Sequence, residues 1–91
     1  MMPNKVTRIK YSPQFLRSVK KLPHHIQTKL EVREFIFKDD AFDARLDTHK
    51  LHGKDRDAWA YSIDHSYRVK FLFSDDGSVL YIKAGTHDEA Y

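Results

Sequence analysis

Histidine is frequent in this chain, with six among 91 residues, and the positions of these residues separate candidates for chemistry from ordinary surface residues. His24 and His25 begin a predicted helix, and His65 lies in a predicted turn. We expect these three histidines to be ordinary solvated surface residues. The other three, at positions 49, 52 and 87, lie beside residues with which they could act together.

His49 and His52 lie in a basic segment that also holds Lys50, Lys54 and Arg56. Two imidazoles three residues apart can ligate zinc, but a site needs a third ligand, and neighbouring cations repel the metal ion. A phosphate group suits such a segment better, because cationic side chains bind its oxygens through charge-assisted hydrogen bonds. We therefore expect this segment to bind substrate phosphates and to hold no metal.

His87 follows the last predicted strand and, taken alone, would be an ordinary surface histidine. Beside Arg68 on a central strand and the basic segment, it completes a set of groups that could hold a scissile phosphate, transfer a proton and neutralise developing charge. Such a set allows the ribose 2′-hydroxyl to act as an internal nucleophile. The pattern is compatible with a metal-free ribonuclease, and the alternative is that Arg68 is an exposed strand cation.

Composition narrows the function classes. The chain has no cysteine, which excludes disulfides, thiolate metal sites and cysteine nucleophiles, and its three glycines form no phosphate-binding loop. The longest apolar runs have four residues, so we expect neither a membrane span nor a signal peptide, and a cytoplasmic location. Residues 1–38 carry nine Lys/Arg and two acids, whereas residues 39–91 carry seven and eleven, so the basic half is N-terminal. A basic N-terminal half suits contact with a polyanionic partner, although a charged, solvated helix face also explains this distribution of charge.

The elements that must position these residues follow from periodicity. Residues 5–11 alternate as a strand, Ser12-Pro13 caps a short helix, and a second helix runs from Pro23 to about Lys38. A charged connection over 41–57 precedes three predicted strands, which are 59–63, 67–73 and 79–84. We expect one α+β domain over 1–91, with the helical hairpin packed on one face of an antiparallel meander. Because side chains alternate between the two faces of a strand, we expect one set to face the helices and the next residues to lie on the other face. The helix-facing set is Tyr67, Val69, Phe71 and Phe73, and the opposite set is Arg68 and Lys70.

The chain resembles the RelE/ParE superfamily of type II toxins, nearest to the RelE, YafQ and YoeB-like mRNA interferases. The resemblance rests on the element order, on His-Lys-Leu-His-Gly at 49–53, on the aromatic strand from Trp59, on Tyr67-Arg68-Val69, and on the closing Gly85-Thr86-His87 through Tyr91. It implies a RelE-like fold and a ribosome-dependent endoribonuclease that cleaves mRNA in the A site, without metal or other cofactor. The ribosome, mRNA and a neutralising antitoxin are the implied partners.

The resemblance also implies residue roles. Arg68 resembles the arginine that holds the scissile phosphate, His87 the C-terminal general acid or base, and Tyr91 the terminal aromatic that orients a base. His49 resembles the loop histidine of YafQ-like members, with His52 as the alternative. Further substrate-binding cations are Lys50, Lys54, Arg56 and Lys70.

The chain departs from the pattern of this superfamily at one place, and one alternative function stays open. RelE-like members place lysines on the strand where this chain has Ala60 and Ser62, which favours histidine chemistry over a lysine-based mechanism. The alternative is a ParE-like toxin that acts on DNA gyrase without cleaving nucleic acid. Such members generally lack the closing histidine motif, so His87 argues against this alternative.

Overall fold

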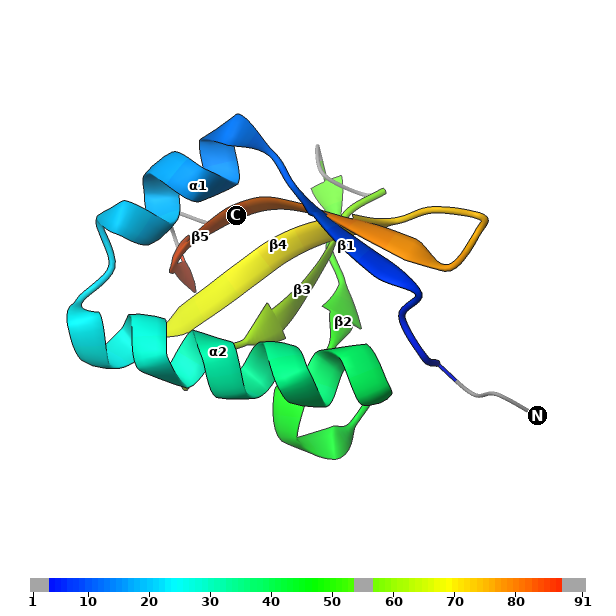
Figure 1. Cartoon of the computed structure of the whole chain (residues 1–91), viewed down its shortest axis with the longest axis horizontal. Coiled ribbons are helices and arrows are strands. Elements are labelled where there is room, and N and C mark those ends of the chain that lie inside the picture. Colours follow the sequence, from blue (N-terminus) through cyan, green and yellow to red (C-terminus); the bar gives the residue numbers. More distant parts are fainter. Residues whose placement is uncertain (1–3, 54–56, 88–91) are drawn as a thin grey trace.

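Two α-helices pack on one face of a five-stranded mixed sheet in the computed structural model, which describes residues 4–53 and 57–87 (Figure 1). The strand order is β1-β5-β4-β3-β2, with β1 parallel to β5 and the other pairs antiparallel. The predicted α+β architecture is confirmed. In chain order the elements are β1 (Arg8–Tyr11), α1 (Pro13–Lys20), α2 (His24–Asp39), the 3₁₀ turn η1 (Ala44–Leu46), β2 (His49–Lys50), β3 (Trp59–Ser62), β4 (Tyr67–Phe73) and β5 (Ser78–Thr86).

Two serines attach α1 to the sheet. The Ser12 hydroxyl accepts the Phe15 N–H at 3.0 Å, as an N-cap does, and lies 3.0 Å from the Ile82 carbonyl, to which it donates. The Ala84 N–H donates to the Ser18 hydroxyl at 2.9 Å. Because β1 pairs with β5 only as far as Tyr81, these serines satisfy strand groups that β1 leaves without a ladder partner.

The main core lies between the helices and the sheet and is rich in aromatic rings. Phe37 of α2 stacks on Tyr61 of β3 at 4.7 Å between ring centroids and meets Phe71 edge-on at 4.9 Å. The Tyr61 and Tyr81 hydroxyls share a buried hydrogen bond of 2.7 Å. Burial in this core raises the pKa of both tyrosines above the ordinary range, because burial disfavours the phenolate.

The alternation expected for β4 is observed over most of the strand. Val69 and Phe71 are fully buried against the helices. Phe73, at the end of β4, remains 37% exposed and stacks on Phe42 at 5.8 Å. Phe73 lies in a satellite aromatic cluster with Phe42 and Trp59, at the margin of the main core.

The connection over 41–57 has more regular structure than its sequence indicated. Within its described part, η1 buries Leu46, and β2 joins the sheet as the neighbour of β3. Asp47 links the two with a positive φ of 51°, a conformation uncommon for a residue with a side chain. Among the described residues, no helix is long and apolar enough to cross a membrane.

Candidate active site

The sheet register aligns candidate residues on the face opposite the helices. His49 is the ladder partner of Ala60, Ala60 of Lys70, and Lys70 of Lys83. Partners in a ladder lie on the same face, and the buried neighbours Val69 and Ala84 point to the helix side. His49 and Lys70 are thus two strands apart, about 10 Å between backbones, with the buried Ala60 between them in the same row.

Arg68 lies in the next row of the same face, where Ser62 and Gly85 are its ladder partners. One terminal nitrogen, Nη1, donates to the carbonyl of Asp64 at 2.8 Å and to that of Tyr67 at 3.3 Å. Its Nε atom is buried and has no hydrogen-bond partner among the described residues. A buried donor of this kind is costly unless a ligand or water satisfies it. Arg68 is therefore held in place by its own hairpin and retains an unused donor.

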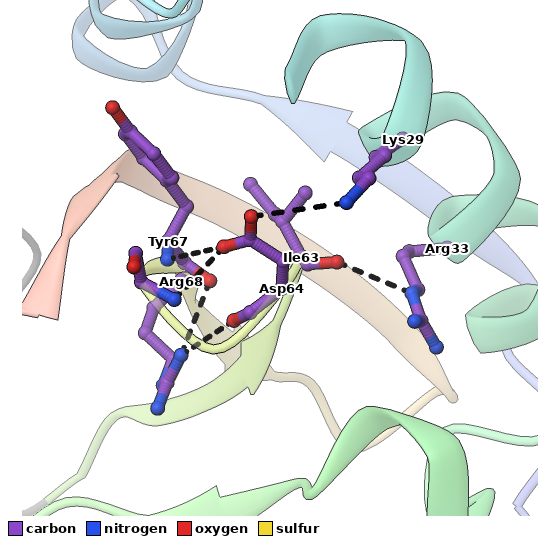
Figure 2. Close-up of polar contacts among 7 residues, drawn as sticks. Lys29, Arg33, Ile63, Asp64, Tyr67 and Arg68 are labelled. Carbon is purple, nitrogen blue, oxygen red and sulfur yellow. Dashed lines mark hydrogen bonds and ion pairs between the residues drawn. The ribbon is translucent and has the colours of Figure 1, made fainter. Parts of the chain in front are cut away.

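The hairpin between β3 and β4 is in turn attached to α2 (Figure 2). Arg33 donates from Nε to the Ile63 carbonyl at 3.2 Å, and Lys29 lies 4.0 Å from the Asp64 carboxylate. The other Asp64 oxygen accepts the N–H groups of Ser66 and Tyr67, each at 2.9 Å. The turn that carries Arg68 is therefore restrained from the helix side as well as from the strand side.

These contacts also set the acidity of Asp64. Burial by itself would raise the pKa of this carboxyl group, but the two donated N–H groups and the positive charge of Lys29 outweigh burial. The net result is a lowered pKa, so Asp64 is ionised at neutral pH. An ionised carboxylate accepts both N–H groups in the best geometry and keeps the turn closed.

His49 has a defined tautomer in its neutral form. Its Nδ1 lies 2.9 Å from the Asp47 carbonyl. Because a carbonyl oxygen can only accept, Nδ1 must carry the proton, and the lone pair of the neutral ring is then on Nε2. The backbone turn at Asp47, with its positive φ, brings this carbonyl to the ring. His49 can therefore exchange a proton through Nε2.

His87 follows directly after β5 and is exposed. Gly85 pairs with Arg68, and His87 comes two residues later, about 7 Å farther along the chain. Arg68 and His87 therefore lie toward the same end of the sheet, whereas His49 lies on β2, at the other side of β3.

The remaining predicted residues are less closely grouped. Lys50 alternates to the face opposite that of His49 and pairs with Trp59, and His52 is exposed beyond β2. Lys54, Arg56 and Tyr91 lie outside the described residues. Among the described residues, no three His, Cys, Asp or Glu side chains are grouped so that they could hold a metal ion.

Sequence reasoning missed Lys83 as a candidate. Phe71 pairs with Tyr81 and Lys70 with Lys83, so Ile82 is an extra residue on β5, a β-bulge. The bulge shifts the alternation of β5 and brings Lys83 beside Lys70. The only sequence signal is a lysine in an apolar strand, and it does not reveal its partner.

Comparison with known proteins identifies the fold. No protein-family model and no curated protein sequence matches the chain. Among solved structures, YafQ from Escherichia coli superposes with a TM-score of 0.76 at 17% identity, covering 91% of this chain and 96% of that one. A chain of the toxin–antitoxin complex RelBE2 from Mycobacterium tuberculosis gives 0.71 at 15% identity, covering 96% and 95%.

A YoeB/ParE toxin from Agrobacterium tumefaciens gives a TM-score of 0.74 at 13% identity, over 89% of this chain and 99% of that one. These matches cover 89–96% of this chain and 95–99% of the others. The chain therefore has the fold that YafQ, RelE and YoeB toxins share.

Proposed function

We propose that the protein is the toxin of a type II toxin–antitoxin system and acts as a ribosome-dependent endoribonuclease on mRNA. The observation that carries the proposal is the half-buried guanidinium of Arg68, which has an unsatisfied Nε donor and lies on the same face as His49 and Lys70. The likeness of the fold to YafQ and YoeB toxins supports it.

The reaction needs two proton transfers and charge stabilisation at phosphorus. A base removes the proton of the 2′-hydroxyl, the 2′-oxygen attacks the adjacent phosphorus, and the bond to the 5′-oxygen breaks as an acid protonates that oxygen. The products are a 2′,3′-cyclic phosphate and a 5′-hydroxyl. We assign the two proton transfers to His49 and His87, and charge stabilisation to Arg68 with Lys70.

The remaining candidates supply binding. His52 is the alternative to His49, and Lys54 and Arg56 are proposed phosphate contacts from the same segment. Tyr91 is the proposed aromatic contact to a base of the codon. Lys50, which alternates away from the Arg68 face, would bind a different part of the RNA.

Mapping of mRNA 5′ ends by primer extension after induction tests the reaction. The parent should produce new ends within coding regions. His87→Ala should reduce cleavage by ~10²–10⁴ and Arg68→Ala by roughly 10²–10³. Arg68→Lys keeps the charge but loses the forked donor, so it should recover only part of the activity.

His65→Ala is the matched control, because His65 is an exposed histidine in the turn beside Arg68. It should cleave like the parent. Unchanged cleavage by His87→Ala and Arg68→Ala at matched expression would refute the assignment. Growth arrest with DNA damage and no new mRNA ends would replace it with gyrase poisoning.

An antitoxin is the proposed protein partner, as in the DinJ–YafQ complex whose toxin fold this chain shares. A groove of about 700 Å³ beside α2 supports a protein contact. Phe35 is 78% exposed and Val32 59% exposed there, which is unusual for large apolar side chains. The groove is lined by three cations, Lys5, Lys38 and Arg45, and by one acid, Asp39. Its excess positive charge favours an acidic, amphipathic segment of the antitoxin.

Co-expression with the product of the adjacent open reading frame tests this contact. Phe35→Ser should weaken the purified complex by roughly 30-fold, the loss of about 2 kcal/mol expected at an interface hot spot. Leu16→Ser is the control, because Leu16 is 51% exposed on α1, outside the groove. Equal affinities for the two variants would exclude the groove as the contact.

A further inference from the structure

A second cationic site lies at the edge of the sheet, between α1 and the last residues of β5. It is a cleft of about 300 Å³ whose lining includes Gln14 and Arg17 from α1, Lys21 just after α1, Tyr67 from β4 and Lys83 from β5. Apart from Lys83, which lies beside Lys70, none of these residues belongs to the candidate active site. The cleft therefore needs its own explanation.

The charged side chains found in the lining of the cleft are all positive. Three cations line it, and its described lining contains no carboxylate. The ion pairs found among the described residues, Lys29 with Asp64 and Arg45 with Asp43, lie elsewhere. Like charges gathered around one cleft repel one another, and a bound anion relieves that repulsion.

The cleft is also rigid. β1 pairs with β5 only to Tyr81, so the later part of β5 has an edge that no strand of the described residues covers. The bond from the Ala84 N–H to the Ser18 hydroxyl holds α1 against this edge, and Ser18 itself donates to the Phe15 carbonyl at 2.8 Å. The cations of α1 and β5 thus face each other across a fixed gap.

Lys83 connects the cleft to the candidate active site. It is the ladder partner of Lys70, and the next residue but one, Gly85, is the partner of Arg68. Basic side chains therefore continue from the Arg68 face, over the edge of β5, to Arg17 on α1 and Lys21 at its C-terminal end. Such a continuous track matches the regularly spaced charges of a nucleic-acid backbone better than it matches a single small anion.

We propose that this cleft binds backbone phosphates of the RNA strand on one side of the scissile bond. The inference rests on the proposed function, because the strand that reaches the cleft is the one held at Arg68. Arg17, Lys21 and Lys83 contact the phosphates, and Gln14 and Tyr67 supply neutral hydrogen-bond donors. An acidic peptide is the less favoured ligand, because the described lining of the cleft includes none of the exposed large apolar side chains that a protein contact needs, whereas Val32 and Phe35 line the groove beside α2.

Binding of a non-cleavable RNA to the full chain tests the proposal. The probe is a fluorescein-labelled 2′-O-methyl oligoribonucleotide, whose binding is followed by anisotropy between 50 and 200 mM KCl, concentrations chosen to span roughly the range in which such contacts weaken. Single Gln variants at Arg17, Lys21 and Lys83 should weaken binding regardless of sequence. Each should reduce the slope of log K against log salt by about 0.7.

Lys20→Gln is the matched control, because Lys20 is an exposed lysine on α1 outside the cleft lining. The triple variant should bind the RNA at least about 10-fold more weakly than Lys20→Gln. If the triple variant and Lys20→Gln lose RNA affinity equally, the basic residues act through a diffuse electrostatic field and not at the cleft, and the proposal is overturned. Unchanged RNA binding by the triple variant, with loss of binding to a labelled poly-glutamate peptide, would assign the cleft to a protein. Competition by inorganic phosphate as strong as by RNA would reduce the site to a small-anion site and also overturn it.

The two proposals fail separately. If the triple variant loses RNA binding but the parent produces no new mRNA ends, the cleft is an RNA site and the nuclease assignment is wrong. If the parent cleaves mRNA and the triple variant cleaves and binds equally well, the nuclease assignment stands and the cleft proposal is wrong.

Discussion

Arg33 on α2 and Arg68 on β4 donate to the carbonyls of two consecutive residues, Ile63 at 3.2 Å and Asp64 at 2.8 Å (Figure 2). The two arginines thereby hold the same turn from different elements. Arg33 also donates from Nη1 to the Arg45 carbonyl at 3.1 Å, so a single side chain ties α2 to both the turn and η1. The position of Arg68 depends on a residue that takes no part in the proposed chemistry.

Arg33→Ala should therefore affect stability and the site together. Loss of its two hydrogen bonds should lower the free energy of unfolding by about 1–3 kcal/mol, measured by urea denaturation. Amide exchange at Ser66 and Tyr67 should accelerate, because the turn loses its restraint on the helix side. Glu31→Ala, an exposed change on the same helix, is the control and should alter neither quantity appreciably. Unchanged exchange at these amides in Arg33→Ala would show that the turn does not need the helix.

Asp64 should contribute to acid sensitivity. Its pKa is lowered in the folded protein, so its ionised form stabilises the fold above the unfolded pKa of about 3.9. That contribution should disappear as the pH falls through the folded pKa. Asp43 and Asp76 also have lowered pKa values, so the measurement is the difference between the parent and Asp64→Asn. The stability difference between them should shrink from pH 6 to about pH 2, and a constant difference would contradict the prediction.

The buried pair Tyr61 and Tyr81 should show strong coupling. Replacement of either by Phe leaves the other hydroxyl buried without its partner, at a cost of about 1–3 kcal/mol in unfolding free energy. The double variant should cost clearly less than the sum of the single variants. Additive losses in thermal or urea denaturation would argue against the shared bond as the cause.

Alkaline titration provides a separate check on the tyrosines. Desolvation, assisted by Glu34, raises the pKa of Tyr11 to about 12, and burial raises the pKa of Tyr61 and Tyr81 well above the ordinary range. Absorbance at the phenolate band should therefore show these three tyrosines un-ionised at about pH 10, where a free tyrosine is half ionised. Titration of all five tyrosines of the chain near pH 10 would contradict the buried environment.

Gly53 and Gly77 form a matched pair for substitution. Both have positive φ, 79° and 86°, so alanine should cost about 1–2 kcal/mol of unfolding free energy at either position. At Gly77 an added Cβ would also lie 3.1 Å from Cγ2 of Thr7, whereas at Gly53 no atom of the described residues is found within 4 Å of it. Gly77→Ala should therefore be the more destabilising, and Thr7→Ser should recover part of the difference because it removes Cγ2. Equal costs would exclude the Thr7 contact as a factor.

Local signals in the sequence determined most of the elements of this fold. Ser12-Pro13 predicted the start of α1 because capping depends on residues close together in the chain, and the Ser12 hydroxyl does accept the Phe15 N–H. Alternation predicted the burial of Val69 and Phe71 for the same reason. Where the environment is set by distant residues, as for Phe73 at the margin of the core, alternation alone was insufficient.

The arrangement of the candidate site was decided by tertiary structure. Which residue lies opposite which depends on hydrogen bonds between distant segments, and a slip of one residue would move every side chain of a strand to the other face. The short strand β2, which brings His49 into the row of Lys70, forms only because β3 offers it an edge. The bulge at Ile82 sets Lys83 beside Lys70, and the clamp of Arg33 on Ile63 joins residues thirty positions apart. The sequence determined which groups were present, and long-range backbone pairing determined which of them lie together.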